Sequence, residues 1–237
     1  MRLIFRLIYT LSVSFFTVSL QAQAPLRPGM DDESKRQFSL VLAVSGTKEI
    51  FYRDGAGEHR MLPPGRTRSP IRYSYDGASP ILFYDKVPGP EDTLVERTLA
   101  RAEFAPSVDD MLILLHPFDE TWGRVRAIVL DDSIESFAPG SVQIVNISIF
   151  PIACSINNER IGLKPTETET IQTETGTNVL NWRIAAKMDA EWRLVRAAST
   201  QFLSGMRQMI IVNVNTANPT NPGLDIFSLN DRPRTDL

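Results

Sequence analysis

Short apolar runs, separated by turn-forming residues, fill the chain from Gln37 onward. The runs are rich in Val, Ile, Phe and Tyr, which favour β-strands. Their regular recurrence, with Gly, Pro, Asn and Asp between them, predicts an all-β sandwich. The runs lie at residues 38–45, 49–53, 71–75, 80–85, 111–116, 125–130, 141–148, 151–156, 179–188, 191–198, 208–215 and 224–229.

Residues 91–104 fit two patterns. Their apolar residues have a helical spacing, but positions 95, 97, 99 and 101 also alternate as along one face of a strand. We favour the strand. Tight turns are expected at Asp54-Gly55, Asp76-Gly77, Asn157-Asn158 and Asp189-Ala190.

The chain resembles itself at an offset of about 100 residues. Residues 102–117 overlie 200–215, with Phe at the third position and Met at the tenth position of both segments. Two unrelated β-domains would also align their apolar runs, but these matched spacings favour duplication. We therefore predict two tandem immunoglobulin-like β-sandwiches. The predicted boundaries are 36–133 and 139–232, with a linker at 134–138 and a tail at 233–237.

The segment LKPTETETIQTETGTN, residues 163–178, has a composition typical of a linker, yet it overlies 62–77, which contains a strand pattern. Thr has good strand propensity, so the repeat predicts a strand here too. Alternation places Thr166, Thr168 and Thr170 on one face, and Glu167 and Glu169 on the other. A strand with so little to bury belongs at a sheet edge, where charge deters unwanted pairing.

The same overlay places Arg66 on Glu167 and Arg68 on Glu169, so the two copies carry opposite charges. One interpretation is that both are simply solvated sheet edges. The other is a head-to-tail contact between molecules, in which the Arg edge of one binds the Glu edge of the next. These four residues are the predicted protein-binding residues.

The N-terminus has the layout of a secretory signal peptide: Arg2 and Arg6, an apolar stretch at residues 7–20, and small residues before Pro25. We predict cleavage after Ala22, then a flexible leader at 23–35, and location in the periplasm, outside the cell or at its surface. The apolar stretch is too short for the roughly 20 residues of a spanning helix, and no membrane span is expected in the mature chain. Without residues 1–22, 23 basic residues face 28 acidic ones, a net charge of −5. Nucleic acid and anionic membranes are therefore excluded as expected partners.

Few residues here are suited to catalysis. The single Cys154 allows no intramolecular disulfide, and it lies in an apolar run where we expect it to be buried and inert. Neither His59 nor His116 has metal-site spacing, and no catalytic motif occurs. We expect no metal and no cofactor. A Ser-His-Asp hydrolase remains the least favoured alternative, built on His116 with Asp109, Asp110 or Asp119.

Aromatic residues offer a carbohydrate-binding alternative, because Trp and Tyr combine flat apolar faces with polar tips. Its residues would be Trp122, in a predicted exposed loop, with Tyr73, Tyr75 and Tyr84. Burial in the core is the competing expectation for all four. Trp182 and Trp192 flank the Asp189-Ala190 turn, and we expect them to pair in the core.

The favoured function is that of an exported, non-catalytic protein that binds proteins or assembles in a bacterial envelope. Its partner would be another protein, or a second copy of the chain, bound through sheet edges. Carbohydrate binding and the hydrolase are the alternatives.

Overall fold

The computed structural model describes residues 35–174, 176, 178–215 and 223–233. The predicted signal peptide at 1–22, almost all of the leader at 23–35, and most of the predicted tail lie outside these residues. The chain from Ser34 onward groups into one compact unit. The predicted boundaries between domains therefore remain a prediction.

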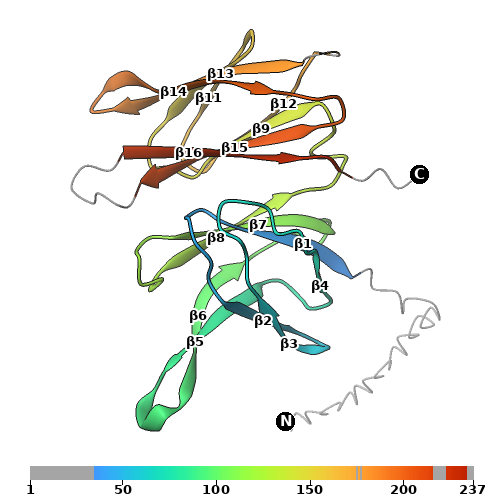
Figure 1. Ribbon diagram of the computed structural model, residues 1–237, viewed down its shortest axis with the longest axis vertical. Helices are drawn as coiled ribbons and strands as arrows, with labels where there is room; N and C mark the ends of the chain where they lie inside the picture. The colour runs from blue at the N-terminus through green and yellow to red at the C-terminus, as the bar shows by residue number, and fades with distance from the viewer. Residues whose placement is uncertain (1–34, 175, 177, 216–222, 234–237) are drawn as a thin grey trace, which may run out of the picture. The chain divides into compact units, whose positions relative to one another are not determined.

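Strands account for nearly all the regular structure of the described residues (Figure 1). Among these residues, the only other element is a 3₁₀ turn, η1 (Pro90–Asp92). The first eight strands are β1 (Arg36–Leu42), β2 (Ile50–Asp54), β3 (Gly57–Met61), β4 (Tyr73–Tyr75), β5 (Ile81–Pro88), β6 (Leu94–Ala102), β7 (Asp110–Pro117) and β8 (Val125–Asp131). The second eight are β9 (Ser141–Asn146), β10 (Ile152–Ile156), β11 (Glu159–Leu163), β12 (Thr168–Gln172), β13 (Val179–Met188), β14 (Glu191–Gln201), β15 (Arg207–Asn215) and β16 (Gly223–Asp231).

The sixteen strands form four sheets whose topology repeats. Sheet A has the order β4-β1-β7-β8 and sheet B the order β3-β2-β5-β6. Adding eight to each number gives sheet C, β12-β9-β15-β16, and sheet D, β11-β10-β13-β14. The rarer parallel pairing is repeated as well, between β1 and β7 and between β9 and β15. We call β1–β8 the first half and β9–β16 the second half.

Each half buries its own core between two sheets. In the first half, Phe38 and Ile113 of sheet A and Phe83 of sheet B belong to one buried cluster. In the second half, Ile210 of sheet C packs in one cluster with Trp182 of sheet D. The prediction of an all-β chain with sandwich-like packing is therefore confirmed.

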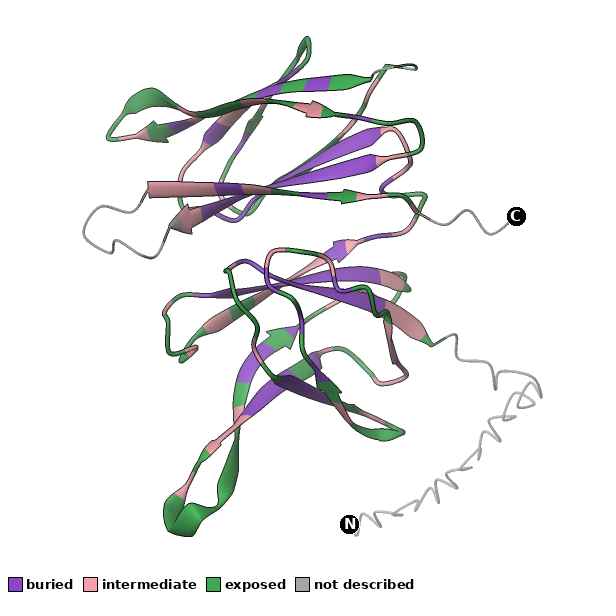
Figure 2. Cartoon of the chain, viewed as in Figure 1, coloured by how far each residue is buried: buried purple, intermediate pink, exposed green. Residues whose placement is uncertain are grey.

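A third cluster joins the opposite faces of sheets A and C. Leu112 and Leu114 of β7 belong to it, together with Met209 and Ile211 of β15. Both faces of these central strands are therefore buried, and Figure 2 shows them largely purple. This burial explains why residues 111–115 and 209–212 are uninterrupted apolar runs, whereas β13 of sheet D alternates between buried and exposed residues.

Only part of the Thr-Glu segment forms the predicted edge strand, because Thr166, with a positive φ of 72°, and Glu167 lie in the turn that precedes it. The central part of the segment is β12, which pairs antiparallel with β9 and has no other partner strand among the described residues. β4 holds the same place beside β1 in the first half. β4 begins only at Tyr73, however, so the region around Arg66 and Arg68 is a loop rather than part of that edge.

The strand prediction for residues 91–104 is confirmed by β6. Two strands, β3 and β11, were not predicted, and each follows a predicted tight turn. Both are edge strands whose polar or charged residues hide the alternation that identifies a strand.

Candidate functional site

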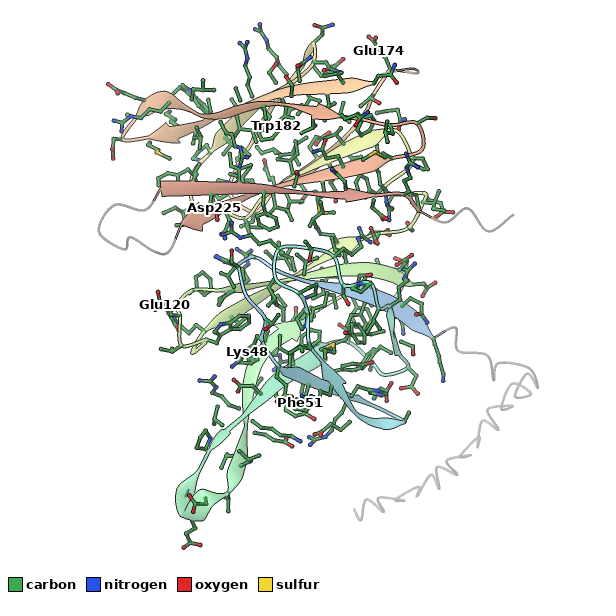
Figure 3. The ribbon with its side chains drawn as sticks, viewed as in Figure 1. Lys48, Phe51, Glu120, Glu174, Trp182 and Asp225 are labelled. Carbon is green, nitrogen blue, oxygen red and sulfur yellow. The ribbon has the colours of Figure 1, made fainter. Side chains whose placement is uncertain are left out.

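Arg66 and Arg68, the predicted basic half of a binding edge, contact acids of their own chain. The Arg66 guanidinium binds Asp225 of β16, which is labelled in Figure 3, and stacks over the ring of Phe227 at 5.4 Å. Arg68 binds Asp132 through both of its terminal nitrogens. Both groups therefore have anionic partners before any second molecule is considered.

Arg68 belongs to a buried charge cluster that links the two halves. Arg207, at the start of β15, has an almost fully buried side chain. Its Nη2 lies 3.0 Å from Asp132 and 2.8 Å from Asp231, and its Nη1 donates to the carbonyl oxygens of Asp132 and Phe137. Buried charges need this kind of full pairing. We interpret the cluster as a structural connection between the halves.

The predicted acidic half of the edge is divided. Glu167 accepts a hydrogen bond of 2.7 Å from the main-chain nitrogen of Lys164, so it closes a turn. Glu169 lies exposed on β12, opposite Ile144 in the register. The chain does not bring these acids to Arg66 or Arg68 by any contact within its described part. The head-to-tail contact between molecules stays a prediction.

The predicted sugar-binding aromatics do not form an exposed platform. Tyr75 and Tyr84 are each 6% exposed, and Tyr73 packs against the first core. The Tyr84 hydroxyl donates to Glu58 at 2.6 Å, and burial together with this carboxylate raises its pKa well above the usual range. Trp122 lies in the loop between β7 and β8 but packs against the same core. These four residues are therefore buried in the core or packed against it, as the competing expectation has it.

His116, the centre of the hydrolase alternative, is 3% exposed. Burial lowers the pKa of His116, with a further effect of the Arg126 charge, so the ring is neutral at pH 7. Asp110 is instead bound to Arg72, and Asp119 accepts from Thr121 within its own loop. No hydrogen bond joins His116 to a serine or an acid among the described residues.

His59 is the histidine that does meet a carboxylate. Its Nε2 lies 2.7 Å from Asp54 across the β2–β3 hairpin, and its ring stacks on Tyr52 at 4.6 Å. Asp54 also accepts from the main chain of Ala56, so the pair serves the turn. The described hydrogen bonds bring no serine to this pair. Within the same residues, no three His, Cys, Asp or Glu side chains gather as a metal site requires.

Unpaired strand edges are the remaining class of candidate site. Within the described residues, the edge strands are β3, β4, β6, β8, β11, β12, β14 and β16. All of them except the three-residue β4 carry at least one charged residue, which opposes pairing with another chain. Five-residue stretches without charge occur only at 197–201 of β14 and 226–230 of β16, with a shorter one at 127–130 of β8.

Two of these three stretches are covered at least in part. β8 lies beside β6. On β16, the Ile226 carbonyl oxygen accepts a 2.6 Å hydrogen bond from Arg196, which crosses over from β14. The stretch Ala197–Gln201 of β14 remains open. It continues the longest described strand of the chain, and its residues are exposed or half-buried.

Two large apolar side chains stand exposed at the other end of β14: Trp192 is 53% exposed and Leu194 is 66% exposed. The expectation that Trp192 pairs with Trp182 in the core is therefore wrong. The register shows why, because Trp192 lies opposite Lys187 and Trp182 lies opposite Ala198. Trp182, labelled in Figure 3, lies on the inner side of sheet D, and Trp192 on the outer side.

The chain matches no protein-family model and no curated protein. In the part of the chain that the structure describes, no helix has the length and apolar character needed to cross a membrane.

Proposed function

We propose that this is an exported, non-catalytic binding protein, which receives an extended segment of a partner protein along the free edge of β14. The observation that supports this proposal is the uncharged, exposed stretch Ala197–Gln201 on a strand that has only one neighbour among the described residues.

Strand addition suits this edge for two reasons. Main-chain N–H and C=O groups on an edge strand that have no partner strand can bind a second backbone and give affinity, whereas side chains at alternate positions give specificity. In this stretch the side chains are small or polar, so a partner strand can approach closely. The exposed Trp192 and Leu194 further along β14 provide apolar contacts for a longer segment.

Two finer predictions belong with this proposal. The first is that each half is an immunoglobulin-like sandwich, supported by two packed four-stranded sheets in each half of the chain. The second is export, supported by the signal-peptide pattern of residues 1–22. Mass spectrometry of the mature protein tests export directly, because processing after Ala22 gives an N-terminus at Gln23.

Proline substitution at two neighbouring positions tests strand addition. In an antiparallel edge strand, successive N–H groups point alternately toward the sheet and toward the free edge. Ala197→Pro and Ala198→Pro therefore differ: one removes a bond to β13 and lowers the melting temperature, and the other removes only an N–H on the free edge. The better-folded variant of the two is the informative one.

A photo-crosslinking amino acid at Ser199 supplies the binding measurement, in extract from cells that make the protein. We expect crosslinks to one segment of a partner protein, and their loss in the better-folded proline variant. The same amino acid at Thr170, on the charged edge strand β12, is the matched control. Equal crosslinking at both positions, or crosslinking that survives the proline substitution, would refute strand addition at β14.

A further inference from the structure

The outward face of sheet D carries positive charge without any acid. The register of β10 with its two neighbours places Arg160, Ser155 and Arg183 in one row across the sheet. Ala197 of β14 completes this row, and Lys187 lies four residues further along β13. Alternation assigns no Asp or Glu of these four strands to the outward face. Figure 3 shows nitrogen-tipped side chains projecting from this side of sheet D.

These cations are available to a ligand. Arg160, Arg183 and Lys187 are all exposed, and none forms an ion pair or side-chain hydrogen bond within the described residues. They stand out in a chain that has 25 basic and 28 acidic residues in total. Their arrangement is therefore not the result of a general excess of positive charge.

The matching face of the first half provides the comparison. The pairs Ile50–Met61 and Ile152–Leu163 start the same register in β2–β3 and β10–β11, so Glu58 holds the place of Arg160, and Arg53 holds that of Ser155.

In that first half the charges neutralise one another. Glu58 accepts from Lys86 at 2.7 Å, and Arg53 binds Glu96. The second half keeps its cations and lacks these acids.

An open trough of 640 Å³ lies among the cations, lined by Ser155, Arg160, Asn181, Arg183, Ala197 and Ser199 among others. Strands in a sheet are about 4.8 Å apart, so the α-carbons of Arg160 and Arg183, two strands apart, are separated by about 10 Å. The trough between them contains hydroxyl and amide groups, and Trp192 lies exposed toward the turn end of the same face.

We infer that this face binds an acidic polysaccharide. Arginine forks bind carboxylates and sulfates in bidentate geometry, hydroxyl and amide groups bond sugar hydroxyls, and an exposed indole stacks on a sugar ring. A protein partner fits less well, because protein interfaces concentrate apolar residues at their centre. Here the centre is charged, and the apolar Trp192 and Leu194 lie at one end. The inference depends on the outward face of sheet D and not on the unpaired main chain of the β14 edge, although Trp192, Ala197 and Ser199 belong to both.

Binding of the mature chain to immobilised polygalacturonate, alginate and heparin tests the inference at low salt. We expect retention on at least one of them, weakened as the ionic strength approaches about 0.15 M. The fully methyl-esterified form of polygalacturonate has the same backbone without charge, and we expect no retention on it. Failure to bind all three acidic polymers overturns the inference.

Variants locate the site. The double variant Arg160→Gln/Arg183→Gln should weaken binding about tenfold or more, with an unchanged melting temperature, because both side chains are exposed. The matched control is Arg101→Gln, which removes an exposed cation of β6 in the first half and should bind like the wild type. Equal binding by the double variant and the control overturns the site.

Two further measurements separate polysaccharide from acidic protein. Trp192→Ala should weaken binding to the polysaccharide, and poly-glutamate should bind more weakly than the glycan. If poly-glutamate binds as well as the glycan and Trp192→Ala has no effect, the ligand class is wrong. Crosslinking from the β14 edge and retention on the acidic polymers are separate measurements, so failure of strand addition and failure of this inference can be told apart.

Discussion

Replacing Arg207 by Met removes the centre of the charge cluster between the two halves. The guanidinium of Arg207 binds the carboxylates of Asp132 and Asp231, donates to the carbonyl oxygens of Asp132 and Phe137, and lies 4.7 Å from the Phe137 ring. Methionine fills a similar volume but supplies no donor. The variant therefore isolates the loss of charge and hydrogen bonds from the loss of packing.

The expected cost follows from these contacts. Removing one partner of a buried ion pair destabilises by about 3–5 kcal/mol, because the remaining charge stays buried. Arg68 still binds Asp132, which moderates this term, but two carbonyl oxygens lose a donor at about 1 kcal/mol each. We expect about 4 kcal/mol in all. For a unit of this size, about 2–4 °C per kcal/mol gives a fall in melting temperature of roughly 8–16 °C.

Calorimetry and urea unfolding of the mature protein measure this loss. Arg101→Met, at an exposed position, is the control and should stay within about 0.5 kcal/mol of the wild type. In a double-mutant cycle with Asp132→Asn, the double variant should lose less stability than the sum of the two single losses, by about 1 kcal/mol or more. A loss below about 1 kcal/mol for Arg207→Met, or strict additivity in the cycle, would refute the argument that this cluster stabilises the fold.

Three further predictions concern buried titratable groups. Burial lowers the pKa of His116, so the unfolded chain takes up a proton at a higher pH than the folded chain does. Stability should therefore fall as the pH drops below about 6.5, by at most about 1.4 kcal/mol per pH unit. Urea unfolding of His116→Leu should show no such dependence on pH. Burial raises the pKa of Asp85, but hydrogen bonds from Arg97 and Lys48 outweigh it and lower the pKa overall. The stability that Asp85 contributes is therefore present above about pH 4 and lost in stronger acid, and Asp85→Asn should flatten that acid limb of the urea midpoints. Burial raises the pKa of the Cys154 thiol to about 12, so a disulfide reagent should label it only in denaturant; rapid labelling of the native protein would contradict this.

The fold was predictable from sequence because its strongest signals are local. Apolar runs and turn pairs located most strands, and the offset of about 100 residues anticipated the repeated topology of the four sheets. The repeat also identified β12, which composition alone would have assigned to a linker. The uninterrupted runs at 111–115 and 209–212 carried a further signal, because strands buried on both faces lose their alternation.

The predicted site residues depended on partners that lie far away in the sequence. Arg66 binds an acid 159 positions away, and Arg68 one that is 64 positions away, and no periodicity identifies such contacts. The exposure of Trp192 could have been predicted by counting residues across the turn, but we had expected the two Trp side chains to pair there. Trp192 lies opposite Lys187, and Lys187 is an odd number of residues from Trp182, so the two indoles must lie on opposite faces.

Comparison of the two halves indicates where function can reside. The central strands of sheets A and C are buried on both faces, so their residues are constrained by packing in either half. The outward faces of sheets B and D are less constrained by packing. They differ at matched positions: Glu58 and Arg53 belong to a network of neutralised charges in the first half, whereas Arg160 and Ser155 leave cations beside an open trough in the second. In sheet B, acids such as Glu58 and Glu96 on neighbouring strands neutralise the cations. The lack of such an acid beside the cations on the described outward face of sheet D supports the proposal that the second half binds the ligand and that the first half is its structural support.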